Sequence, residues 1–232
     1  MFRFKQFAIH QERTAMKVCT DACVLGAYAD VGAGGRILDI GTGTGLLALM
    51  AAQRNATAYI DAVEIDEAAA GQAQENISAS PFAERVRVVQ ERIQAFVPGE
   101  NYERILTNPP FYTNHLRSPD AAVNRALHTD DLPLKELIEA VVRLLKQDGQ
   151  WWVLLPPYEA GQLTEQASMA GLKPFRRLHL RHHARKPVFR VITGFDYQTE
   201  AATDEMLDIY EPDGRMYTEP FRALLKDFYL IF

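Results

Sequence analysis

Four consecutive residues, Asn108, Pro109, Pro110 and Phe111, combine groups that can hold and polarise a planar amino group. The prolines fix the backbone and remove amide donors, so carbonyls are free to accept, and the Asn108 side chain offers a second acceptor oxygen. Two acceptors that bind both amino hydrogens orient the nitrogen and shift charge onto it. Phe111 adds an aromatic plane for a base drawn out of its stack. The pattern predicts that Asn108, Pro109 and Phe111 are catalytic residues of a reaction that needs no strong base. The alternative is a proline-rich turn.

A glycine loop, Gly41 to Gly45, lies upstream between a strand predicted at 36–40 and a helix predicted from residue 46. A strand, a glycine loop and a helix in this order build a ligand cradle at the carboxyl edge of a sheet, because glycines allow tight turning and close approach of a ligand. The spacing is G-x-G-x-G, preceded by Asp39, and not the G-x-G-x-x-G of a dinucleotide site, which argues against a dehydrogenase. The alternative is a glycine-rich turn in another α/β protein.

Both stretches resemble motifs of the S-adenosylmethionine (SAM)-dependent methyltransferases. The glycine loop resembles their motif I, which wraps the amino-acid end of SAM. Residues 108–111 resemble motif IV, N-P-P-[YFW], of the amino-methyltransferases, which act on adenine N6 in nucleic acids or on glutamine in release factors. The resemblance implies SAM as the cofactor and S-adenosylhomocysteine as its product. The cofactor contacts that it implies around these motifs are Asp39, Gly41, Thr42, Gly43, Gly45 and Asn108.

Glu64 closes a second predicted strand, at 59–64, and stands 23 positions after Gly41. This spacing fits the acid that holds the two ribose hydroxyls in nucleotide-binding βαβ units. A carboxylate suits a vicinal diol because it accepts two hydrogen bonds at once. The alternative is an exposed acid at a strand end.

The adenine end of the cofactor is expected near a third predicted strand, at 85–90. Members of the family often carry an acid just after this strand to bind the adenine amino group. Arg92 stands at that position here, so the usual contact is missing. We expect Ile65, Arg92 and Ile93 to border the adenine, with Ile93 packed on its ring.

A helix is expected before the glycine loop, within residues 17–30. Thr20 suits its N-cap and Asp21 suits its first turn. Lys17, Thr20 and Asp21 are polar and lie one short loop upstream of the glycine loop. We therefore expect them to form a flap over the cofactor; the alternative is a capped helix that only packs.

The charge of the chain is uneven. A net charge of -5, from Lys+Arg 25 and Asp+Glu 30, does not by itself indicate a nucleic-acid-binding protein. Residues 173–190 are nevertheless rich in Lys, Arg and His and hold no acid, whereas acids dominate 196–213. A local basic face can hold a phosphate backbone; the alternative is a solvated hairpin. The predicted RNA contacts are Arg176, Arg177, Arg181, His183, Arg185 and Lys186.

The predicted elements alternate along the chain until a hairpin, 175–181 and 188–197, closes the sheet. Between them lie strands at 102–107 and 149–155 and helices at 67–78, 132–146 and 158–170. This order is typical of an α/β, Rossmann-like class I methyltransferase. We expect a seven-stranded, mostly parallel sheet with an antiparallel final hairpin strand and helices on both faces.

One domain, 1–232, is expected at this length. Residues 1–30 would form an N-terminal arm and helix, and residues 198–232 a tail docked on the core. No apolar run reaches membrane-spanning length, and the N-terminus does not resemble a signal peptide. Cys19 and Cys23 are the only cysteines, so we expect reduced thiols, a cytoplasmic protein and no metal site. A monomer is compatible with the sequence, which does not specify the oligomeric state.

Three further stretches extend the resemblance over nearly the whole chain: KVCTDACVLGAYAD, HHARKP and YTEPFRALLKDFYLIF. Together they resemble the bacterial adenine N6-methyltransferases that act on adenine 37 of a valine tRNA. The resemblance implies a tRNA partner, although no residue spacing shows which tRNA. The departures are Arg92 and the cysteines at 19 and 23, where small residues are usual.

Three other functions stay open at this point. They are a protein glutamine N5-methyltransferase, another nucleic-acid adenine N6-methyltransferase and a nucleotide-binding module without catalysis. The basic segment at 176–190 favours RNA over protein. The intact sequence at 108–111 favours catalysis.

Overall fold

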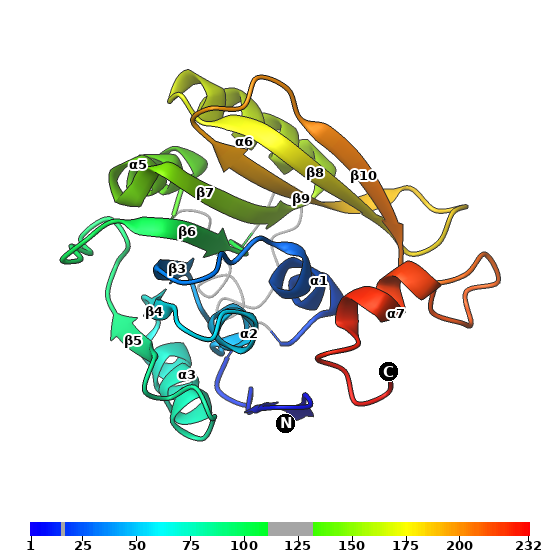
Figure 1. Ribbon diagram of the computed structural model, residues 1–232, viewed down its shortest axis with the longest axis horizontal. Helices are drawn as coiled ribbons and strands as arrows, with labels where there is room; N and C mark the ends of the chain where they lie inside the picture. Colours follow the sequence, from blue (N-terminus) through cyan, green and yellow to red (C-terminus); the bar gives the residue numbers. More distant parts are fainter. Residues whose placement is uncertain (15–16, 111–131) are drawn as a thin grey trace, which may run out of the picture.

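The computed structural model describes residues 1–14, 17–110 and 132–232, and its centre is an eight-stranded sheet (Figure 1). The strand order is β10-β8-β9-β7-β6-β3-β4-β5, and within this sheet β9 alone runs antiparallel to both neighbours. The class I methyltransferase fold predicted from the sequence is confirmed. The strands of this sheet are β3 (Arg36–Ile40), β4 (Tyr59–Glu64), β5 (Val86–Gln90), β6 (Tyr102–Thr107), β7 (Leu145–Leu155), β8 (Lys173–Arg181), β9 (Val188–Asp196) and β10 (Thr203–Asp208).

Helices cover both faces of the sheet, as expected (Figure 1). They are α1 (Thr20–Tyr28), α2 (Leu46–Arg54), α3 (Glu67–Ser78), α5 (Leu134–Leu144), α6 (Pro157–Met169) and α7 (Glu219–Leu225). Successive side chains of a strand point to opposite faces. In β7, Trp152 and Leu154 accordingly join the core with α1 and α2, whereas Trp151 and Val153 join the core with α5 and α6.

The sheet holds one strand more than the predicted seven. This strand, β10, lies within the segment expected to be a tail, and it pairs in parallel with β8. Its sequence, TDEMLD, is too polar to signal a strand. Its register places Asp204 opposite Arg177 and Asp208 opposite Arg181, so opposite charges on neighbouring strands support the pairing.

Several predicted boundaries are wrong in detail. Thr20 is the first residue of α1 and Cys19 holds the N-cap position, without a side-chain capping hydrogen bond. The helix expected at 132–146 is α5, which begins at Leu134 and ends at Leu144, and β7 begins at once with Leu145. The early start of β7 follows from sheet pairing, because Leu145 pairs with Tyr102 of β6.

Several segments meet at the carboxyl edge of the sheet. The parallel strands β3, β4, β5 and β6 all end there. Leu155 at the end of β7 pairs with Val191, and Arg181 at the end of β8 pairs with Val188. The β8–β9 turn, 182–187, therefore lies at the same edge as the glycine loop and Asn108.

The two ends of the chain pack together (Figure 1). The N-terminal arm forms a short hairpin of β1 (Phe2–Arg3) and β2 (Ala8–Ile9). Phe4 forms a β-bridge with Tyr229, and the Lys5 amide donates to the Phe228 carbonyl over 2.9 Å. The residues after α7 thus hold the arm against the core.

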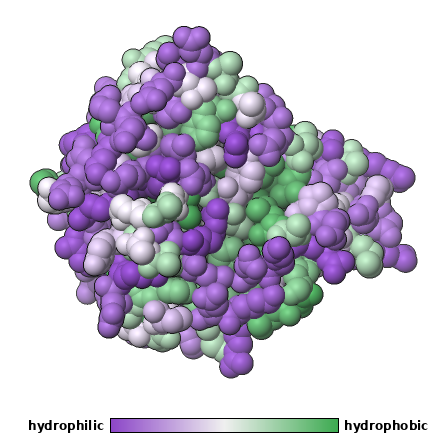
Figure 2. All heavy atoms as spheres, in the orientation of Figure 1, coloured by the Kyte–Doolittle hydropathy of each residue, from purple (hydrophilic) through white to green (hydrophobic). Residues whose placement is uncertain are grey.

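The face seen in Figure 2 is largely hydrophilic, and its hydrophobic atoms gather around α1 and α7. Both helices pack buried side chains into the same hydrophobic core, among them Leu25 of α1 and Phe221 of α7. No helix in the described part of the chain is both long and apolar enough to cross a membrane.

Phe221 is fully buried in α7, and its ring lies 5.1 Å from that of Tyr217. Phe221→Ala should lower the free energy of unfolding by about 3–5 kcal/mol, because it leaves a cavity between α7 and the core. Urea denaturation measures this change. Leu230→Ala is the control: Leu230 is 59% exposed, and its loss should change stability by less than about 0.5 kcal/mol. Equal midpoints for the two variants would show that α7 does not unfold with the core.

Candidate active site

The glycine loop follows β3 at the carboxyl edge and presents its backbone to open space. Gly41 and Gly43 have φ of 70° and 57°, a region that favours glycine. A Cβ atom added to either residue would meet no heavy atom within 4 Å. The amides of Gly41 and Thr42 donate to the Val63 carbonyl over 2.9 and 3.1 Å, which ties the loop to β4. A ligand can therefore approach the loop backbone directly.

Asp39 lies beneath this loop and is fully buried. Its Oδ2 accepts from the Thr42 hydroxyl over 2.5 Å and from the Ala48 amide over 3.1 Å. Its Oδ1 has no hydrogen-bond partner among the described residues. Burial raises the pKa of Asp39 to about 7, and the nearby Glu64 carboxylate acts in the same direction. Asp39 shapes the loop from below; its contact with a cofactor stays a prediction.

Glu64 joins the ends of β3 and β4. Its Oε2 accepts from the Gly43 amide over 2.8 Å, and its Oε1 accepts from the Asp66 amide over 3.0 Å. Burial raises the pKa of this carboxyl as well. Each oxygen keeps a further lone pair, so the carboxylate can still accept hydrogen bonds from a diol. Two buried acids beside an open glycine loop suit a ligand that carries a diol and positive charge.

Asn108 follows β6, the strand beside β3. Thr107 pairs with Ile40, so Asn108 and Gly41 leave the sheet side by side. The Asn108 Oδ1 atom is buried and has no hydrogen-bond partner among the described residues. An unpaired buried amide oxygen costs roughly 1–3 kcal/mol, and this atom is available to accept a hydrogen bond from a ligand. Pro109 is buried next to it, and Phe111 lies outside the described residues.

The residues expected near the adenine lie at the ends of β4 and β5. Ile65 is 44% exposed, whereas Ile93 is 5% exposed. The Ile93 carbonyl accepts from Arg143 of α5 over 2.7 Å, and Arg92 is exposed. Ile65 therefore offers apolar surface at the edge, and Ile93 lies mainly in the core. Their contacts with a cofactor stay predictions.

The side chains expected in a flap have protein partners. Lys17 Nζ donates to the carbonyls of Gln11 and, over 2.9 Å, Thr14. Asp21 Oδ2 accepts from Arg190 Nε of β9 over 2.9 Å. Lys17 thus contacts the backbone at Gln11 and Thr14, and Asp21 connects α1 to the sheet. Thr20, at the start of α1, is partly exposed.

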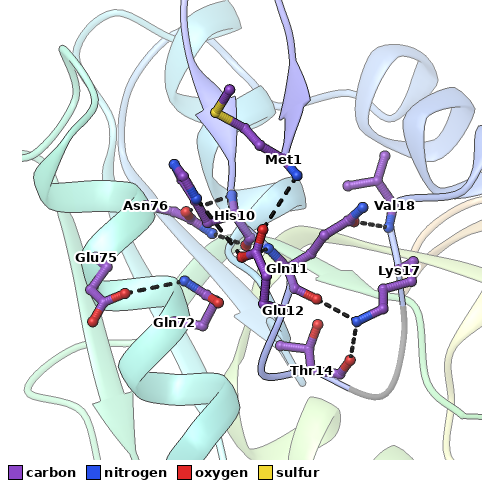
Figure 3. A network of polar contacts seen from close by, with 10 residues as sticks. All are labelled: Met1, His10, Gln11, Glu12, Thr14, Lys17, Val18, Gln72, Glu75 and Asn76. Carbon is purple, nitrogen blue, oxygen red and sulfur yellow. Dashed lines mark hydrogen bonds and ion pairs between the residues drawn. The ribbon is translucent and has the colours of Figure 1, made fainter.

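Asn76 of α3 is a site residue that the sequence analysis missed (Figure 3). Its Nδ2 donates to the His10 carbonyl over 2.8 Å and to the Thr44 carbonyl in the glycine loop over 2.9 Å. Its Oδ1 accepts from the His10 amide over 2.9 Å. One buried side chain thus joins α3, the glycine loop and the N-terminal arm. The available signal was an asparagine beside Ile77 and Ala73 on the apolar face of α3.

The basic segment divides into two parts. Arg181 Nε of β8 lies 2.7 Å from Asp208 of β10, and Arg177 and Arg176 lie 3.5 Å from Asp204 and Glu205. The β8–β9 turn instead carries His183, Arg185 and Lys186, and neither Arg185 nor Lys186 forms an ion pair with a described residue. The acids of β10 therefore neutralise the first part, and positive charge remains at the turn.

The comparisons with known proteins agree with this geometry. Residues 23–162 match the model of the methyltransferase small domain. A predicted O-methyltransferase of Agrobacterium tumefaciens shares the fold, with a TM-score of 0.70 and 17% identity over 89% of this chain and 96% of that chain. The fold and the matched domain define the chain as a methyltransferase, a class that uses SAM as methyl donor.

Full-length relatives define the family more narrowly. The tRNA1(Val) (adenine(37)-N6)-methyltransferase of Dyadobacter fermentans is 48% identical over 100% of this chain and 98% of its own length. The enzyme of that name from Pedobacter heparinus is 42% identical, also over 100% of this chain and 98% of its own. The chain belongs to this family, which confirms the resemblance inferred from the sequence.

Within the described residues, no group of three or more His, Cys, Asp and Glu side chains could hold a metal ion.

Asn76→Ala should weaken SAM binding by about tenfold, because the Thr44 carbonyl and the arm lose their common partner. Calorimetric titration with SAM measures the change. Asn55→Ala is the matched control: Asn55 is equally buried, at 2%, and its Nδ2 donates to the carbonyls of Val31 and Gly34 at the opposite edge of the sheet. Both variants should lose roughly 1–3 kcal/mol of stability per orphaned group. Equal SAM affinities in the two variants would make Asn76 a purely structural residue.

The buried Asp39 should make the ligand-free protein less stable as the pH rises. An aspartate of an unfolded chain titrates near ~4, whereas the folded pKa is about 7, so the native state binds more protons between these values. The free energy of unfolding should fall across this window by up to ~1.4 kcal/mol per pH unit. Asp39→Asn should flatten this slope in urea denaturation between pH 4 and 8. An unchanged slope would show that Asp39 titrates normally.

Proposed function

We propose that this protein transfers a methyl group from SAM to the N6 amino group of adenine 37 in tRNA1(Val). The observation that carries the proposal is the buried Asn108 Oδ1 beside the glycine loop, which has no hydrogen-bond partner among the described residues. The family supports the choice of adenine N6 and of tRNA. The choice of the valine tRNA and of position 37 rests on the names of the relatives alone.

The residues around the glycine loop fit the cofactor. The backbone of Gly41 and Gly43 is open to the amino-acid end of SAM, and Asp39 and Glu64 favour its positive charge. Glu64 keeps acceptors for the ribose hydroxyls, and Ile65 offers exposed apolar surface for the adenine. SAM, when bound, would supply an electrophilic methyl group and, as its S–CH3 bond breaks, a neutral leaving group, S-adenosylhomocysteine.

Asn108 and Pro109 act on the substrate amino group. The Asn108 Oδ1 accepts one amino hydrogen, and a carbonyl of the proline stretch accepts the other. The carbonyl is free to do so because prolines have no backbone N–H that could donate to it. These two acceptors hold the nitrogen toward the cofactor and stabilise the positive charge that it gains as the new bond forms. Its extra proton then leaves to solvent, so no strong base is required.

Methylation of RNA tests the function directly. The enzyme, labelled SAM and total RNA from a strain that lacks this enzyme should yield N6-methyladenosine in a valine tRNA after nuclease digestion. Label in N6-methyladenosine of another tRNA would support the proposed activity but show that the substrate is a different tRNA. Label in protein glutamine, with none in RNA, would establish the glutamine methyltransferase instead.

Asn108→Ala should lower the single-turnover rate of tRNA methylation by about 10²-fold or more, because an interaction made mainly in the transition state is lost. SAM affinity should stay within about threefold of wild type. Asn108→Asp keeps an acceptor oxygen and should retain partial activity. Asn101→Ala is the control, because Asn101 is exposed and lies before β6. Wild-type rates in Asn108→Ala would show that residues 108–111 form only a turn and take no part in catalysis.

A further inference from the structure

A partly exposed aromatic stack lies in the β8–β9 hairpin. The ring of His182 stacks on that of Phe189, with centroids 4.3 Å apart and planes only 5° from parallel. The Arg190 guanidinium lies 5.6 Å from the centroid of Phe189. His182 is exposed at the end of this stack. None of the methyl-transfer steps described above uses these side chains.

The stack is held in place from several sides. Arg190 donates to Asp21 of α1 over 2.9 Å. The Tyr210 amide donates to the His182 carbonyl over 2.8 Å, which fixes the backbone at the end of β8. The Lys186 amide donates to the His183 carbonyl over 2.9 Å and closes the turn. The His182 ring is thus preorganised, which lowers the entropy lost when a partner binds.

The position and charge of the stack indicate the kind of partner. It lies at the carboxyl edge of the sheet, the edge at which Asn108 and the glycine loop also lie. Arg185 and Lys186 are exposed beside it and form no ion pair with any residue that the structure describes. An aromatic ring next to free cations is the combination that binds unpaired bases and their phosphates.

We propose that the exposed His182 ring is a stacking site for an unpaired base of the RNA substrate, other than the adenine that is methylated, and that Arg185 and Lys186 bind the adjoining phosphates. The inference rests on the proposed function, since it takes RNA as the substrate. The proposal assigns RNA recognition to the β8–β9 turn. Arg176, Arg177 and Arg181 instead pair with the acids of β10. The other possibility is that the stack only stiffens the hairpin.

Binding of a tRNA1(Val) transcript to the full-length protein with S-adenosylhomocysteine tests the proposal. His182→Ala should weaken RNA binding by about 5- to 150-fold, the range for one stacked base. His182→Trp should stay within about threefold of wild type. His179→Ala is the control, because His179 of β8 pairs with Asp204 over 2.7 Å. Arg185→Gln with Lys186→Gln should reduce the salt slope by roughly one unit for each lost phosphate contact.

Abasic substitutions separate direct stacking from stiffening of the hairpin. Each loop nucleotide of the anticodon stem-loop is made abasic in turn and combined with His182→Ala. If the ring stacks on a base, one abasic position should remove the effect of His182→Ala, as in a double-mutant cycle. Additive losses at every position, or unchanged RNA affinity in His182→Ala, would overturn the stacking site. The methylation assay on wild type decides the proposed function separately, because it does not depend on His182.

Discussion

Two buried carboxylates under one glycine loop set the conditions for the whole site. Asp39 and Glu64 accept hydrogen bonds from the loop and from the helix that follows it, so their positions fix the backbone around Gly43. Burial raises the pKa of both acids, and the charge of Glu64 raises that of Asp39 further. A cationic ligand relieves this repulsion. The same acids that shape the loop therefore make it unfavourable for a phosphate.

The second constraint is the placement of charge on an acidic chain. A net charge of -5 works against long-range attraction of RNA. The acids of β10 remove much of the positive charge of β8 by pairing with Arg177 and Arg181. Arg185 and Lys186 form no ion pair with a described residue, and they lie at the edge of the sheet where Asn108 follows β6. Positive charge that is not neutralised by β10 is therefore available at this edge.

Much of the fold could be predicted because its signals are local. Strand, glycine loop and helix follow one another within residues 36–54, and the strand ends at Glu64 and Thr107 were located from apolar runs closed by polar residues. The strand β10 escaped prediction because TDEMLD is mostly polar, with Met206 and Leu207 as its apolar residues. Leu207 packs into the core, and the acids of β10 pair with cations of β8; these partners are distant in sequence. Helix boundaries erred by one or two residues where sheet pairing decided them, as at Leu145.

The sequence by itself determined which residues stand at the ends of the strands: Asn108, the glycines of the loop and Glu64. Only the tertiary structure decided their partners. Arg190 meets Asp21 across 169 positions, and Asn76 meets His10 across 66, so neither pairing has a local pattern. Local propensity and turn chemistry are written in a few neighbouring residues, whereas the partner of a buried polar group depends on strand order and helix packing, which arise only when the whole chain has folded.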